Sequence, residues 1–214
     1  MYHLSHVGTA GRGLHIAFTG TDGVGKSTQG RILAERLTAA GAPAFLAEAK
    51  DDFTNHVVQE LLGEDDPYAA RRFLGHQITD VVRSFDMLRD IANIVTPRTR
   101  AETHVVVPRS VYCRLALARA FGETDPVVIS RLEQLLTFHA LPDVALWLDV
   151  PVDVTMARIR ARGTDDEDPD VMARFATALE ELHDRHHFVR IDATGTVEEV
   201  AATVWVSVGP HLES

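Results

Sequence analysis

The sequence contains little of what a disulfide framework, a membrane span or a nucleic-acid surface requires. One cysteine, Cys113, among 214 residues excludes an intramolecular disulfide. No run approaches the roughly 18 consecutive apolar residues of a membrane-spanning helix. Acidic residues number 31 against 21 basic ones, and the formal net charge of −10 argues against a general binder of nucleic acid or of anionic lipid. We therefore expect a soluble cytoplasmic protein with no nucleic-acid or membrane partner, in which local positive groups could still bind a small anion.

The first 13 residues, MYHLSHVGTAGRG, lack the apolar h-region of a signal peptide, so we expect them to form a loose leader. The chain is 45% apolar, and residues 14–214 are numerous enough to bury a proper core. No internal repeat and no low-complexity linker divides this segment. One domain over residues 14–214 is therefore expected.

Strand-like and helix-like segments alternate along this domain. Helical spacing of apolar residues predicts a helix over 28–40, and a long helical region is expected over 68–99. Short, nearly continuous apolar runs predict strands at 14–19, 42–49, 103–108, 143–150 and 187–192. Runs of this kind are typical of a parallel sheet covered on both faces. The pattern predicts a doubly wound α/β domain with five parallel strands, whose ligands bind at the carboxyl ends of the strands.

A glycine-rich stretch, GTDGVGKS at residues 20–27, lies between the first expected strand and the first expected helix. It satisfies the pattern G-x-x-x-x-G-K-[ST], with Gly20, Gly25, Lys26 and Ser27 at the fixed positions. The glycines let the backbone curl so that successive N–H groups face phosphate oxygens, and the helix N-terminus adds a favourable dipole. Lys26 would reach the β- and γ-phosphates, and Ser27 would coordinate Mg²⁺. The stretch therefore predicts a site for ATP and its magnesium ion.

Asp22 lies inside this loop, three residues before Gly25. A carboxylate there repels the phosphates of the nucleotide, so we expect it to point away from them, toward a second ligand that carries hydroxyl groups. The alternative is that Asp22 caps the turn through local hydrogen bonds. Phosphate binding alone does not distinguish a kinase from a GTPase-type switch or a motor, so the second ligand matters.

Three stretches in order along the chain resemble the thymidylate kinase family. The first is IAFTGTDGVGKSTQGRILAERL at 16–37, the second LPDVALWLDVPVDVTMARIRARG at 141–163, and the third FATALEELHDRHHFVRIDATGTVEEVAATV at 175–204. The resemblance implies a P-loop NTPase fold with a small lid at about 163–170. It also implies ATP- and Mg²⁺-dependent transfer of a phosphoryl group to a nucleoside monophosphate.

The resemblance also assigns residues to the donor nucleotide. In the loop and the following helix these are Gly20, Gly23, Val24, Gly25, Lys26, Ser27 and Thr28. The expected lid, GTDDEDPD at 163–170, is acidic and carries no Lys or Arg, although members without a loop arginine usually supply positive charge from the lid. Arg158 and Arg162 precede it at i, i+4 spacing, so they could serve the adenine and the transferring phosphoryl group. The alternative for both is a solvated basic helix end.

The third expected strand is followed by Pro108-Arg109-Ser110, where the resembled family has Asp-Arg. Arg109 is retained and would bridge the phosphates of donor and acceptor, because a forked cation suits spread negative charge. Pro108 cannot replace an aspartate that helps to organise Mg²⁺. Metal binding must then depend on Ser27, on water and on another carboxylate.

Glu48, at the end of the second expected strand, is the leading candidate for that carboxylate. Thymidylate kinases have Arg-Glu-Pro-Gly-Gly here, and this chain keeps only the Glu. Related deoxynucleoside kinases place a base-like glutamate at the same strand end. Glu48 therefore fits two roles, as an organiser of metal and water or as a general base for an acceptor hydroxyl.

Recognition of the acceptor base is the least family-like part of the chain. Where thymidylate kinases often show Ser-x-x-Ala-Tyr-Gln, residues 113–118 read CRLALA. The long helical region offers Phe73 to stack on the base and Arg83 to meet the acceptor phosphate, but counting back from Pro97 does not place an arginine at the family's usual distance. The bland alternative is a core Phe and an exposed Arg.

Three functions remain open from the sequence. The first is a nucleoside monophosphate kinase. The second is a kinase that phosphorylates a hydroxyl of a nucleoside or specialised metabolite, favoured by Glu48 and by the missing base-reading residues. The third is a non-catalytic ATP-binding module. Dimers are common in the resembled family, so a homodimer is also expected.

Overall fold

A computed structural model describes residues 11–47, 53–66, 68–122, 124–139, 141–163 and 167–212. Its centre is a five-stranded sheet in which every strand pair is parallel. The strands are β1 His15–Thr19, β2 Ala44–Leu46, β3 His104–Val107, β4 Val144–Asp149 and β5 Val189–Asp192, in the spatial order β2-β3-β1-β4-β5. The predicted parallel α/β fold is confirmed, although the second strand is shorter than the 42–49 expected.

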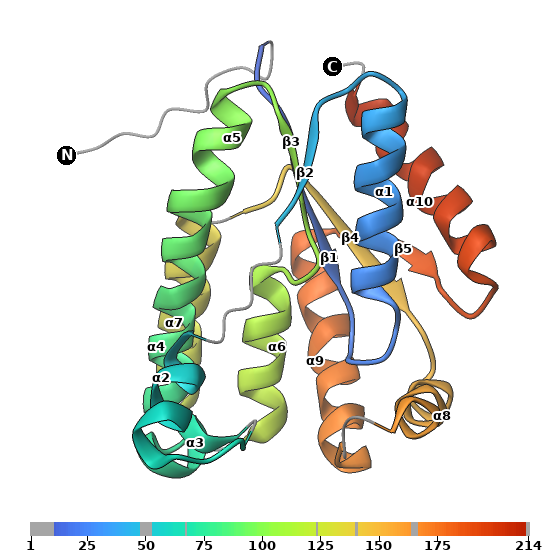
Figure 1. Cartoon of the computed structure of the whole chain (residues 1–214). Helices are drawn as coiled ribbons and strands as arrows, with labels where there is room; N and C mark the ends of the chain where they lie inside the picture. The colour runs from blue at the N-terminus through green and yellow to red at the C-terminus, as the bar shows by residue number, and fades with distance from the viewer. Residues whose placement is uncertain are drawn as a thin grey trace.

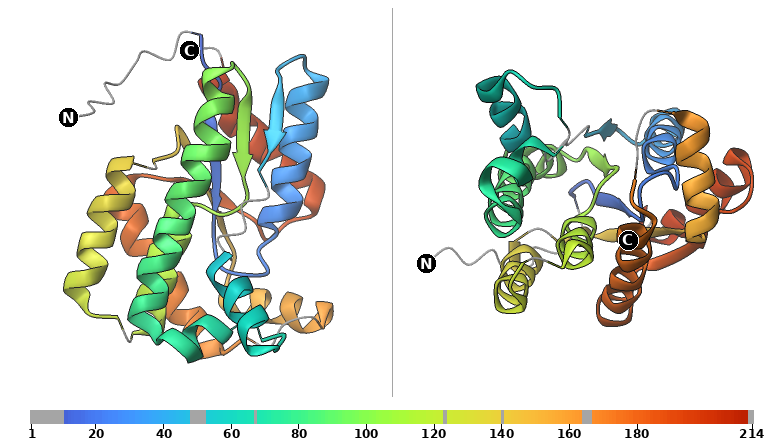
Figure 2. Two further views of the ribbon diagram at one scale, coloured as in Figure 1. Left: turned by 60° about the vertical axis from the view of Figure 1, so that its left-hand side comes forward. Right: turned by 90° about the horizontal axis from the view of Figure 1, so that it is seen from below.

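Helices cover both faces of the sheet, as Figure 1 shows. Helices α1 Lys26–Ala39 and α10 Val197–Leu212 pack against each other on one face. The other face is covered by a layer that includes α6 Val111–Phe121, α7 Pro126–His139 and α9 Pro169–His186. Seen from below, the two helical layers lie on opposite sides of the sheet (Figure 2, right).

Each face has its own apolar core. Ile16 and Phe18 of β1 point to the same face, because alternate residues of a strand share a face. Both are fully buried there, beside Leu33 of α1. On the other face, Trp147 of β4 packs with Phe175 of α9 and further buried side chains of α6 and α7. The sheet is thus apolar on both sides, which is the pattern that its continuous apolar strands predict.

The long helical region expected over 68–99 is interrupted. Helix α3 spans Ala69–Leu74 and stops at Gly75, whose φ of 77° is a left-handed conformation that glycine adopts without strain. The chain then continues through α4 His76–Asp90, a π-helical turn η1 Ile91–Val95 and α5 Thr96–Arg100. Together with α2 Phe53–Leu62, α3 forms a small lobe that packs on α4. The expected helical region at 68–99 is thus helical along nearly its whole length, with one break at Gly75.

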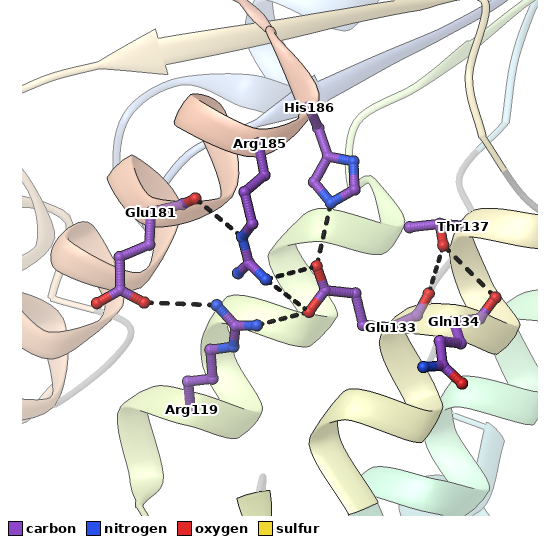
Figure 3. A network of polar contacts seen from close by, with 7 residues as sticks. All are labelled: Arg119, Glu133, Gln134, Thr137, Glu181, Arg185 and His186. Atoms are coloured by element: carbon purple, nitrogen blue, oxygen red, sulfur yellow. Dashed lines mark hydrogen bonds and ion pairs between the residues drawn. The ribbon is translucent and has the colours of Figure 1, made fainter. Parts of the chain in front are cut away.

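Glu133 of α7 joins three helices on the face opposite α1 (Figure 3). Its carboxylate accepts from Arg119 of α6 at 2.6 Å, from Arg185 of α9 at 2.9 Å and from His186 of α9 at 3.1 Å. The Glu133 side chain is 15% exposed. One partly buried carboxylate thus ties α6, α7 and α9 together, with Glu181 as an outer partner of Arg119.

The strand order determines which loops meet at the carboxyl edge of the sheet. Strand β1 pairs with β3 on one side and with β4 on the other. The loop after β1, at residues 20–25, therefore lies next to the segment after β3, at residues 108–110. Helix α8 Val152–Arg162 follows β4 and begins at this same edge. This edge brings together groups that are distant in the sequence.

Candidate active site

The loop between β1 and α1 has the backbone that its glycines allow. Gly20, Gly23 and Gly25 have φ values of 147°, 83° and 99°, which residues with a side chain rarely adopt. At Gly20 the space is also closed, because a Cβ there would lie 2.8 Å from the carbonyl oxygen of Leu148 in β4. Val24 is buried at the centre of the loop. At Gly23 a Cβ would lie 2.8 Å from Ile159 of α8, so the loop is held tightly between the sheet and α8.

Helix α1 begins at Lys26, directly after Gly25, which has no side chain that could cap the first-turn N–H groups. Such groups, together with the helix dipole, form a site for a phosphate group. Ser27 and Thr28 are exposed in this first turn. The predicted donor-phosphate residues of the loop are thus gathered at one helix N-terminus.

Lys26 is only 8% exposed and its side chain folds back over the loop. Its Nζ donates to the carbonyl oxygens of Gly20 at 2.9 Å and of Thr21 at 2.6 Å. The same ammonium lies 3.5 Å from Oδ1 of Asp22. The positive charge of Lys26 is therefore held at the centre of the loop.

Asp22 and Arg109 form an ion pair across this edge, with 2.9 Å between Asp22 Oδ1 and Arg109 Nη2. Burial alone would raise the pKa of the Asp22 carboxyl, but the charges of Arg109 and Lys26 outweigh it and lower this pKa to about 2. Arg109 and Lys26 thus converge on one oxygen atom of Asp22. A phosphate oxygen is the other kind of anion that suits such a position.

A buried pair of hydroxyls joins the two loops behind these charges. Thr19, the last residue of β1, and Ser110, which follows Arg109, lie with their Oγ atoms 2.5 Å apart. The Ser110 amide donates to the carbonyl of Phe18, and its Oγ caps α6 by accepting from the amide of Cys113. This pair could not be foreseen from the sequence, since it depends on β1 and β3 being neighbours.

A group of buried charged residues around α3 and α4 was also not foreseen from the sequence. Arg71 donates to the fully buried Asp80 at 2.7 Å, and Asp80 also accepts from Thr124 at 2.7 Å. Arg114 of α6 is 1% exposed. Burial lowers the pKa of Arg71, and the charge of Arg114 adds to this effect. Buried charges of this kind are uncommon and could have been sought as arginines inside apolar helical stretches.

The other predicted site residues lie on α8, α3 and α4, or outside the described residues. Arg158 is half-buried and donates to the carbonyls of Ala193 and Thr194 after β5, while Arg162 is exposed at the end of α8. Phe73 is 53% exposed on α3, and Arg83 is half-buried on α4. Glu48 lies outside the described residues, so its two predicted roles stay predictions.

The expected lid at 163–170 is described only at its two ends, since residues 164–166 fall outside the described part of the chain. At its far end, Tyr68 donates its hydroxyl to Oε2 of Glu167 at 3.3 Å. Tyr68 directly precedes α3, so one end of this segment contacts the small lobe. The acidic lid segment therefore begins at α8 and ends beside α3.

Within the described ranges, no group of three or more His, Cys, Asp or Glu side chains is placed to hold a metal ion. The exposed hydroxyl of Ser27 is the predicted metal ligand that falls within these ranges. None of the described helices is long and apolar enough to cross a membrane.

Comparisons with known proteins agree on one family. The family model described as thymidylate kinase matches residues 18–204. The chain is 30% identical to a thymidylate kinase of Synechococcus sp. (strain JA-2-3B'a(2-13)) over 93% of this chain and 96% of that protein. It is 29% identical to a thymidylate kinase of Psychrobacter sp. (strain PRwf-1), over 94% of this chain and 99% of the relative. The matched region includes the glycine-rich loop, Arg109 and the expected lid.

Proposed function

The chain belongs to the thymidylate kinase family, and we propose that it transfers the γ-phosphoryl group of ATP to a nucleoside monophosphate, with thymidylate as the first acceptor to test. The observation that carries this proposal is the convergence of Lys26 and Arg109 on one oxygen of Asp22. Lys26 at the start of α1 and Arg109 after β3 are two cations from separate segments, and their meeting at one anionic oxygen suits a phosphoryl group shared between donor and acceptor.

The loop residues fit the triphosphate of ATP. The first-turn amides of α1 and the ammonium of Lys26 supply positive charge, and the open space beside Gly25 leaves room for the phosphates. On the adenine side we propose Arg158 and Arg162. Mg²⁺, when bound, neutralises charge on the phosphate oxygens, and we propose that Ser27 and Glu48 hold it.

Arg109 would bind the acceptor phosphate at the moment of transfer. For this its guanidinium exchanges the carboxylate of Asp22 for phosphate oxygens, which are equally suited to a forked donor. Asp22, released from Arg109, can then accept a hydrogen bond from a hydroxyl of the acceptor sugar. Phe73 and Arg83 are proposed contacts of the acceptor, on the α3 and α4 side of the site.

A kinase for a hydroxyl acceptor is the second candidate. Such an acceptor benefits from a general base, and the best bases have a pKa near the working pH. Asp22 is a poor proton acceptor while Arg109 and Lys26 hold its pKa at about 2, so this reaction needs another base such as Glu48. A monophosphate acceptor is already a competent nucleophile, which favours the first proposal.

An acceptor panel tests these proposals together. Each nucleoside and nucleoside monophosphate is incubated with Mg·ATP, and the product is identified by its mass. A diphosphate product supports the monophosphate kinase, a phosphorylated hydroxyl supports the second candidate, and bound nucleotide without product supports a non-catalytic ATP-binding module.

Lys26→Ala tests the role of the loop in the same assay. We expect phosphoryl transfer to be abolished, because the loop loses the cation nearest to the transferring group. Arg31→Ala, which removes an exposed cation from the same helix, is the matched control and should keep wild-type turnover. Wild-type turnover in Lys26→Ala contradicts the proposed phosphate site.

A homodimer and a cytoplasmic location complete the proposal. Helix α2 exposes Phe53, Val57 and Leu61 at four-residue spacing, and α4 exposes Phe85. Apolar side chains along one helix face suit a contact between two copies. Light scattering at several protein concentrations measures the mass, and a monomer at all of them contradicts the dimer.

A further inference from the structure

The two loops that carry Lys26 and Arg109 are joined at one buried point. Strand β1 ends at Thr19 and β3 ends at Val107, and the two strands are parallel neighbours (Figure 1). Beyond these ends each chain turns away into its own loop, so regular ladder bonds no longer fix the loops to each other. The distance between Lys26 and Arg109 must therefore be set by other contacts.

Those contacts gather at Ser110. Its amide continues the pairing of the strands by donating to the carbonyl of Phe18 at 3.0 Å. Its Oγ lies 2.5 Å from Oγ1 of Thr19 and also accepts from the amide of Cys113 at 3.3 Å. Thr19 is 0% exposed and Ser110 is 3% exposed, so water does not compete for these hydroxyls.

The junction reaches Lys26 through the carbonyl of Gly20. Cys113 is 1% exposed, and its Sγ lies 3.7 Å from this carbonyl oxygen and 3.8 Å from Oγ of Ser110. The same carbonyl accepts from Nζ of Lys26 at 2.9 Å. A short chain of contacts thus leads from Ser110, next to Arg109, to the ammonium of Lys26.

We propose that the hydroxyl pair of Thr19 and Ser110 is the positioning element that fixes Arg109 relative to Lys26 for phosphoryl transfer. Neither hydroxyl touches the reacting groups. The pair instead holds the two loops at the separation at which both cations reach one oxygen, as they do at Oδ1 of Asp22. Transfer needs both cations on the same phosphoryl group, so small shifts of one loop cost rate. This inference rests on the proposed function.

Thr19→Val tests the pair because valine has nearly the same shape and lacks the hydroxyl. We expect kcat to fall about tenfold to a hundredfold, the range for a misplaced catalytic group, with the KM for ATP changed less than about twofold. Thr19→Ser restores the hydroxyl and should recover most of the rate. Thr99→Val removes another buried threonine hydroxyl, on α5, and should keep wild-type kcat.

A variant of Arg109 distinguishes positioning from a general structural effect. If Thr19 acts through Arg109, then Thr19→Val causes no further loss of kcat in an Arg109→Ala background. An equal loss in both backgrounds overturns the proposal. Ser110→Ala is the second variant, should Thr19→Val fail to fold, and it should show the same loss of kcat.

Cys113, the single cysteine of the chain, provides a readout that does not need activity. A thiol reagent modifies a buried cysteine only when the surrounding structure opens locally. We expect Thr19→Val to speed the modification of Cys113 about fivefold to tenfold, since one buried hydrogen bond is lost. Thr99→Val should leave the modification rate unchanged.

The kcat of phosphoryl transfer and the modification rate of Cys113 distinguish a failure of the proposed function from a failure of the positioning role. Absence of transfer by the wild-type protein on the whole acceptor panel rejects the proposed function, while the modification of Cys113 still tests the junction. A Thr19→Val protein with wild-type kcat, or with an unchanged modification rate of Cys113, overturns the role of the pair.

Discussion

Asp22 and Arg109 are 87 positions apart in the sequence and form an ion pair of 2.9 Å at the carboxyl edge of the sheet. The carboxylate is also within 3.5 Å of the Lys26 ammonium. An anion of the protein thus lies between the two cations, at the position that we assign to a phosphate oxygen. Nucleotide binding therefore has to compete with Asp22.

Asp22→Asn removes this competing charge. We expect ADP to bind about fivefold more tightly, a gain of about 1 kcal/mol, because the loop no longer carries an anion that repels phosphate. Turnover should fall, since the acceptor loses its proposed partner. Titration calorimetry with ADP measures the affinity. Asp184→Asn, on the exposed side of α9, makes the same change in net charge and should bind ADP like the wild type.

His15 makes the stability of the fold depend on pH. Burial lowers its pKa to about 4, with Asp143 opposing and Arg12 adding to this effect. Between pH 6.5 and 4, His15 binds a proton in the unfolded chain but not in the folded chain. The free energy of unfolding therefore falls as the pH falls. The loss should reach about 3 kcal/mol, since one pKa unit corresponds to about 1.4 kcal/mol.

Urea denaturation at pH 7.5, 6, 5 and 4 measures this dependence. His15→Gln should reduce the slope, whereas the exposed His211→Gln should keep it. The Asp22 carboxyl, with its pKa of about 2, acts in a lower range, because its contribution is present above about pH 4 and is lost only as the pH falls through 2. A flat stability between pH 7.5 and 4 contradicts the assignment to His15.

Glu133→Gln should destabilise the fold by about 2 kcal/mol. The amide keeps the size of the side chain but removes the charge that Arg119, Arg185 and His186 share (Figure 3). Glu181→Gln is the matched control, since Glu181 is 63% exposed and meets Arg119 at 3.5 Å. It should cost less than about 0.5 kcal/mol. Equal costs for the two variants, measured by chemical denaturation, contradict the conclusion that Glu133 ties α6, α7 and α9 together.

Gly20→Ala should cost more than about 3 kcal/mol and abolish ATP binding. The new Cβ meets the carbonyl of Leu148 at 2.8 Å, and φ is 147°, so the backbone of the loop has to move. Gly41→Ala, after α1, has φ of 84° and open space, and should cost only about 1 kcal/mol. Thermal denaturation and ADP titration of both variants compare the two effects.

The parts of the site that the sequence predicts are those whose signal is local. The loop at 20–27 can be read because its glycines, Lys26 and Ser27 are contiguous and lie between a strand and a helix. Arg109 can be placed at the same edge since it follows a strand of a parallel sheet. The sheet itself follows from five apolar runs.

The partners of these residues cannot be predicted in the same way. Asp22 meets Arg109, and Thr19 meets Ser110, only because β1 and β3 are neighbours, and the strand order is not written in any single segment. The buried pair of Arg71 and Asp80 likewise depends on how α3 turns at Gly75. Polar residues that the sequence alone would place in solvent can therefore be buried in the fold, as Arg71 and Asp80 are.

The π-helical turn at Ile91–Val95 changes how distances along the α4 and α5 helices are counted. A π turn holds one residue more than an α turn, and one residue corresponds to about 100° of rotation about the helix axis. Suppose that a position is counted back from Pro97 in ordinary α-helical turns. Every residue before Ile91 then lies at the same offset, about 100° around the helix axis, from the place that this count gives. The side of α4 that would face an acceptor, including Arg83, is out of phase with α5. Base-reading positions of a relative therefore have to be transferred to this chain by superposing the helices in space, with α4 and α5 aligned separately on the two sides of the π turn.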